Sequence, residues 1–75
     1  MAANEVTFEL IRHCGVIDEN PKTHWRKELN VVTWNGGEPK YDIREWSPDH
    51  QRMTRGITLS FEHAAKVAEL LAAAL

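Results

Sequence analysis

Apolar and polar residues alternate along three stretches of the chain, residues 5–12, 24–34 and 40–46. A period of two places alternate side chains on opposite faces of an extended backbone, so each stretch is predicted to be a β-strand with one apolar face. Gly15 indicates a bulge after the first stretch, beyond which Val16 and Ile17 are expected to continue the strand.

The turn between the second and third strands constrains their register. Asn-Gly-Gly at positions 35–37 is a strong turn sequence. The apolar residues of both strands must share a face, which requires a loop with an odd number of residues. A three-residue loop places Glu28 opposite Arg44, whereas a five-residue loop places Glu28 opposite Trp46.

The rest of the chain is predicted to form a turn at residues 47–50, a polar connection, a short fourth strand at residues 56–59 and one helix. Ser60 is a favourable N-cap. From Phe61 onward apolar residues recur at spacings of three and four, as in an amphipathic helix. The predicted fold class is therefore α+β, a four-stranded antiparallel sheet followed by one C-terminal helix (ββββα), in a single domain over residues 1–75.

One helix can cover only one face of such a sheet. The face expected under the helix carries Phe8, Leu29, Val31, Tyr41, Ile43, Ile57 and Leu59. The face expected to remain open carries Arg26, Asn30, Trp34, Lys40, Arg44 and Trp46. The last six residues, LLAAAL, carry no charge and are not expected to face water.

Composition narrows the class of protein. The chain has 75 residues and one cysteine, Cys14, so it cannot form an intrachain disulfide. Cys14 is expected to be a small core residue. The acidic N-terminus does not resemble a signal peptide, and no apolar run approaches a membrane span, so a soluble cytoplasmic location is expected. The net charge is −2, yet residues 22–55 hold seven Lys and Arg against five Asp and Glu.

Tryptophans among arginines and lysines on an exposed sheet face are typical of a platform for single-stranded nucleic acid. Bases of any sequence stack on an aromatic ring, and the cations follow the phosphates. Two alternatives remain open from the residues alone. In the first, the charged residues form an ordinary solvated surface and the tryptophans cap the edges of the sheet. In the second, the same Trp/Arg face binds a protein partner, so that the domain is a protein-interaction module.

A longer segment carries a family resemblance. Residues 24–60, and within them Asp42-Ile43-Arg44-Glu45 and Arg55-Gly56-Ile57-Thr58-Leu59, closely resemble the YdbC-like bacterial members of the positive cofactor 4 type of transcriptional coactivators. The chain departs from the eukaryotic members at Gly36-Gly37-Glu38, where those have a basic loop.

The resemblance implies a homodimer, with its helices packed at or near the interface, that binds single-stranded DNA with little sequence preference and contacts the transcription machinery. RNA stays open as a ligand, because no residue is an evident reader of the 2′-hydroxyl. The residues expected to bind nucleic acid are Arg26, Trp34, Lys40, Arg44, Trp46 and Arg55, with the tryptophans stacking on bases and the cations on phosphates.

Neither a metal site nor an active site is predicted. The four histidines and Cys14 lack zinc-ligand spacing, and no cofactor is expected. The chain has no Gly-rich phosphate loop and no G-x-S-x-G sequence, so the protein is not expected to be an enzyme.

Overall fold

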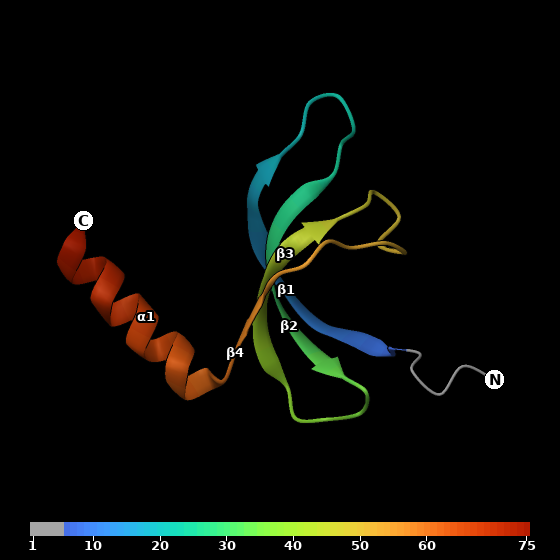
Figure 1. Cartoon of the computed structure of the whole chain (residues 1–75). Helices are drawn as coiled ribbons and strands as arrows, with labels where there is room; N and C mark the ends of the chain where they lie inside the picture. Colours follow the sequence, from blue (N-terminus) through green and yellow to red (C-terminus); the bar gives the residue numbers. More distant parts are fainter. Residues whose placement is uncertain (1–5) are drawn as a thin grey trace.

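A computed structural model describes residues 6–75, and it contains the predicted ββββα order (Figure 1). The elements are β1 (Phe8–Glu19), β2 (Arg26–Trp34), β3 (Lys40–Trp46), β4 (Ile57–Leu59) and α1 (Phe61–Ala74). Glu5, the first residue of the predicted first strand, lies outside the described residues. The four strands form one antiparallel sheet in the order β1-β2-β3-β4.

The register between β2 and β3 is that of the three-residue loop, because Glu28 lies opposite Arg44. Asn35 and Gly36 both have positive φ, and the N–H of Gly37 donates to the carbonyl of Trp34 at 2.9 Å. Asn and Gly tolerate this backbone conformation better than other residues, which explains the turn sequence.

Strand β1 continues two residues beyond the predicted Ile17, to Glu19, and is strongly irregular. Its register against β2 shifts three times, at Ile11, Cys14 and Ile17. The shift beside Gly15 confirms the predicted bulge. Bulges increase the local twist of a strand and bend it. Cys14 is exposed, so the prediction that it is a small core residue was wrong.

The sheet curls over on itself, and this curl forms the core. Phe8 lies opposite Trp34 at one end of β2, whereas Trp46 lies opposite Arg26 at the other end. Yet the ring of Phe8 is 5.1 Å from that of Trp46 and 5.8 Å from that of Trp34. The two ends of the sheet therefore approach each other across one face, which we call the concave face.

The concave face is the one that the sequence predicted to be open. It contains five fully buried side chains, Glu28, Asn30, Val32, Asp42 and Trp46. The prediction that Phe8 lies on the helix-covered face was also wrong, because Phe8 packs in this interior. Alternation identified which residues share a face on β2 and β3, but curvature decides which face closes.

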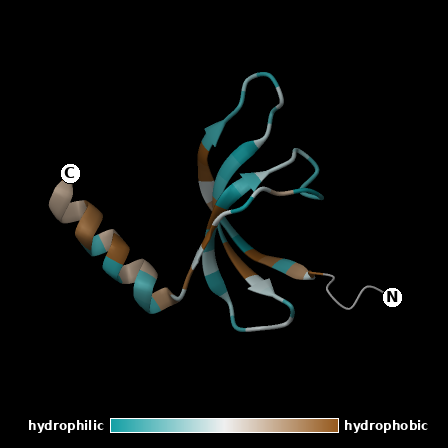
Figure 2. Ribbon diagram, in the orientation of Figure 1, coloured by the Kyte–Doolittle hydropathy of each residue, from teal (hydrophilic) through white to brown (hydrophobic). Residues whose placement is uncertain are grey.

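Helix α1 lies on the opposite, convex side and extends away from the sheet (Figure 1). Ser60 caps it as predicted, since its hydroxyl accepts from the N–H of His63 at 3.1 Å. No residue of the helix is itself buried within the chain. An apolar groove of about 550 Å³ lies between α1 and the sheet and is lined in part by Leu29, Ile43, Val67 and Leu71. Hydrophobic segments occur in both α1 and the strands (Figure 2).

Gly56 is required where the connection from β3 turns into β4. A Cβ at this position would overlap the carbonyl oxygen of Ile43 and the Cβ of Arg44. By contrast, a Cβ at Gly15 would meet nothing within 4 Å. The close approach at Gly56 lets β4 pair with β3 directly beside the Arg44 side chain.

We predict that Gly56→Ala lowers the free energy of unfolding by about 1–3 kcal/mol or more, because the added methyl group forces the backbone at residue 56 away from β3. Urea denaturation measures the change, and Gly15→Ala is the matched control, expected to be near neutral. Equal effects of the two substitutions would contradict the steric role of Gly56.

Candidate nucleic-acid interface

The structure divides the six residues predicted to bind nucleic acid into an exposed set and an internal set. Arg26, Lys40 and Arg55 are exposed, and Trp34 is half-buried. Arg44 keeps only 13% of its side chain exposed, and Trp46 has no exposed surface. Four of the six are therefore accessible to a ligand.

Trp46 is a core residue, so the prediction that it lies on an exposed face was wrong. Its backbone is flanked by β2 on one side and by a bridge to Met53 on the other. Its ring packs against Phe8 and lies 5.6 Å from the ring of His50. The β3–β4 connection and the curled start of β1 together cover the ring, and no sequence pattern signalled either contact.

Arg44 is held by a buried carboxylate and acts as a positioning residue. Its Nε and Nη2 donate to the two oxygens of Asp42 at 2.6 and 2.7 Å, and Asp42 also accepts from the hydroxyl of Thr58 at 2.8 Å. Its Nη1 donates to the carbonyl of Thr54 at 3.2 Å. Such a bidentate pair fixes the plane of the guanidinium group.

Arg44 in turn positions Trp34. Its Cζ lies 4.5 Å from the centroid of the Trp34 ring, a cation–π geometry. Phe8 packs beside the same ring. The indole Nε1–H is buried without an acceptor, as is that of Trp46. Trp34 is thus a partly exposed aromatic ring at the end of β2, and Arg44 and Phe8 pack against it.

Lys40 and Trp34 lie on the same face and close together. Lys40 is opposite Val32, which is the neighbour of Trp34 on that face of β2. Diagonal neighbours of this kind lie about 7–8 Å apart, within reach of a long side chain. A cation therefore accompanies the ring, as a platform for single strands requires.

Arg26 lies at the opposite end of β2 and pairs with Glu19. Its Nε donates to Glu19 Oε1 at 2.9 Å, while His24 Nδ1 lies 3.1 Å from Oε2. Hydrogen bonds from His24 and Arg26 lower the pKa of Glu19 below its ordinary value. Half of the Arg26 side chain remains exposed, so it can still reach a phosphate.

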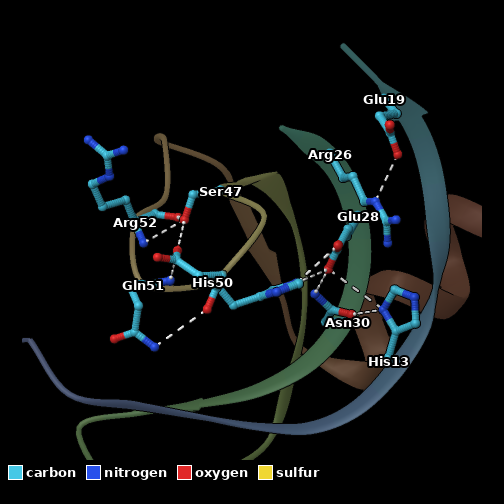
Figure 3. A network of polar contacts seen from close by, with 10 residues as sticks. His13, Glu19, Arg26, Glu28, Asn30, Ser47, His50, Gln51 and Arg52 are labelled. Atoms are coloured by element: carbon cyan, nitrogen blue, oxygen red, sulfur yellow. Dashed lines mark hydrogen bonds and ion pairs between the residues drawn. The ribbon is translucent and has the colours of Figure 1, made fainter. Parts of the chain in front are cut away.

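Beside Arg26, a buried carboxylate is held by two histidines (Figure 3). Glu28 is 1% exposed and accepts from Asn30 Nδ2 at 3.0 Å and from His50 Nε2 at 3.0 and 3.1 Å. His13 Nδ1 lies 2.7 Å from Asn30 Oδ1 and 3.6 Å from Glu28. No pattern in the sequence indicated the contacts of either histidine, because His13 comes from β1 and His50 from the turn after β3.

Two opposing effects act on the pKa of Glu28. Burial alone raises it, but the hydrogen bonds from Asn30 and His50 and the charges of His50 and His13 together outweigh burial, so the pKa lies below its ordinary value. A carboxyl group with a lowered folded-state pKa stabilises the fold above its unfolded pKa. That stability is lost as the pH falls through the folded pKa.

We therefore predict that the free energy of unfolding of the native chain falls between about pH 5 and pH 3 more steeply than that of Glu28→Gln. The variant should also lose about 1–3 kcal/mol at neutral pH through its disturbed hydrogen bonds. Urea denaturation at several pH values measures both effects. The remaining acidic residues are common to the two chains, so parallel curves would exclude the linkage to Glu28.

Among residues 6–75, no helix is long and apolar enough to cross a membrane, and no three His, Cys, Asp or Glu side chains are placed to bind a metal ion.

Comparison with known proteins identifies the family of this chain. A protein of Treponema pallidum (strain Nichols), itself uncharacterised, is 38% identical over 64 residues, which cover 85% of this chain and 74% of that protein. The family model described as Transcriptional Coactivator p15 (PC4) matches residues 22–70, which include β2, β3, β4 and most of α1. The chain therefore belongs to the transcriptional coactivator p15 (PC4) family.

Proposed function

We propose that this protein binds single-stranded DNA without catalysis, as a homodimer, in transcription or in the protection of single strands. Membership of the PC4 family indicates single-stranded DNA binding and transcription coactivation in general. The observation that carries the finer proposal is the half-buried Trp34 ring, braced by Arg44 and accompanied by Lys40.

The proposed interface uses four of the six residues predicted from the sequence. Trp34 stacks on a base, and the exposed cations Arg26, Lys40 and Arg55 contact phosphates. Arg44 holds the ring in place, and Trp46 holds the curl that carries it.

Single strands are the expected ligand because they present unstacked bases, whereas a duplex offers only phosphates to such a ring. We predict that Trp34→Ala weakens binding of a ~20-mer of oligo-dT by about 1–3 kcal/mol. Fluorescence anisotropy of the labelled oligonucleotide measures the affinity. Trp34→Phe, which retains an aromatic ring, should recover part of the loss.

The cations provide an independent test of the same interface. Lys40→Ala should reduce the slope of log K against log salt by about 0.7, the value for one phosphate contact on a single strand. Lys66→Ala, on the exposed surface of α1, is the matched control and should leave the slope unchanged. Tight, salt-independent binding to a protein partner, with no response to oligo-dT, would instead favour an interaction module.

The homodimer is proposed from the convex side of the molecule. Ile57, Leu70 and Leu71 are all more than half exposed, and the groove between α1 and the sheet is lined by apolar side chains. A contiguous apolar surface of this kind is unusual on a stable monomer. A second copy, docked with its own α1 against the first, would bury both surfaces by the same contacts.

We predict that Leu71→Glu shifts the protein from dimer to monomer in sedimentation-velocity experiments, because it places a charge in the groove. Lys66→Glu, also on α1 but outside the groove lining, should leave the dimer intact. A native chain that sediments as a monomer at all concentrations would refute the proposed dimer.

A further inference from the structure

A second cavity lies at the end of the concave face that carries Arg26, and four of the five residues that line it are ionisable. It has a volume of about 240 Å³ and is lined by Leu10, His13, Arg26, Glu28 and His50. The proposed interface uses only Arg26 from this set. Figure 3 shows His13 from β1 and His50 from the turn after β3 approaching Glu28 from opposite sides.

The hydrogen bonds determine which nitrogen of each histidine carries a proton. Asn30 donates from its Nδ2 to Glu28, and this orients the amide so that its oxygen, Oδ1, faces His13. An amide oxygen only accepts hydrogen bonds, so His13 Nδ1 must be the donor. His50 Nε2 faces both oxygens of the Glu28 carboxylate and must likewise be a donor. The other nitrogen of each ring, His13 Nε2 and His50 Nδ1, is left without a role in this network.

A second proton on either ring therefore breaks no hydrogen bond of the network. It adds a positive charge next to the buried carboxylate of Glu28. Both rings reach the surface, with 53% of the His13 side chain and 34% of the His50 side chain exposed. Protonation thus places charge where a ligand can meet it.

The charges around the cavity change sign when both rings are protonated. Arg26 is offset by Glu19, and Glu28 leaves the group at −1 while the histidines are neutral. Two protons bring it to +1. The other ionisable groups nearby are His24, which pairs with Glu19, and Asp49, which lies in the turn that carries His50 and is bonded to Ser47 and Gln51.

We infer that this cavity is a phosphate subsite, which binds a backbone phosphate of the single strand only when His13 and His50 are protonated. The inference rests on the proposed single-stranded DNA binding and adds a pH dependence to it. Arg26 provides the permanent charge, and the two imidazolium rings provide the remaining donors. Affinity for single strands then rises as the pH falls, because only the protonated rings carry a positive charge.

The experiment compares oligo-dT binding at about pH 8 and about pH 5.5, which lie on either side of the reference pKa of a free histidine side chain, about 6.5. Salt titrations at each pH use the native chain, the double variant His13→Gln/His50→Gln, and His63→Gln as the matched control on α1. Glutamine retains an amide donor for the buried partners. Thymine has no group that titrates between these pH values, so the oligonucleotide does not contribute.

Two extra phosphate-facing charges should steepen the salt slope of the native chain at low pH by about 1.4 relative to the double variant. When the salt concentration falls from 1 M to 0.1 M, a slope difference of about 1.4 raises the affinity of the native chain roughly 25-fold more than that of the double variant. His63→Gln should respond as the native chain does. Any pH response through His24 is common to all three proteins and cancels in the comparison.

An identical pH response in the native chain and the double variant overturns the subsite while leaving single-strand binding intact. Absence of oligo-dT binding by the native chain at both pH values overturns the proposed function itself, and the subsite with it. Thermal unfolding checks that the double variant folds. If it does not, His13→Gln alone, at a largely exposed position, should remove about 0.7 of the slope change, and no change would overturn the subsite.

Discussion

The hydrogen-bonded ion pair between the buried carboxylate of Asp42 and Arg44 is the interaction on which most of this structure depends. Asp42 has no exposed surface, and a charge in that position is tolerated only when its partners are close and well oriented. Arg44 supplies two donors from the same strand, and Thr58 supplies a third from β4. Removing one partner from such a group costs far more than an exposed ion pair contributes, so these three residues form a unit.

This unit explains why the motif residues occur together. The Asp-Ile-Arg segment supplies the carboxylate and the guanidinium group, and the Gly-Ile-Thr segment supplies the hydroxyl. Gly56 allows the two segments to approach, because any side chain there would overlap β3. The same guanidinium group then reaches across the curl to the Trp34 ring. The core of the sheet and the proposed base-stacking ring are therefore held by one side chain, and a change in either affects the other.

Local features of the fold could be predicted from the sequence because they depend on local chemistry. The alternation in residues 24–34 and 40–46, the Asn-Gly turn and the Ser60 cap each act within a few residues, and the structure contains all of them. The curl could not be predicted in this way. It depends on three bulges in β1 and on a contact between Phe8 and Trp46, which lie at opposite ends of the paired strands. Accordingly, the sequence located Arg26, Lys40 and Arg55 on the surface but placed Trp46 there as well.

The curl also explains how so short a chain arranges two apolar surfaces. A sheet that closes on its own concave face can bury Trp46 and Val32 without the helix, and it hides its polar residues only by pairing them, as Glu28 and Asp42 show. The helix is then not needed to cover that core and extends from β4 with its apolar side unfilled. A domain of this size buries only about 60% of the surface of its unfolded chain, and the proposed second copy would supply further apolar contacts. The proposed binding residues lie on the concave side and the apolar residues on the convex side, so the two proposed interactions could form together.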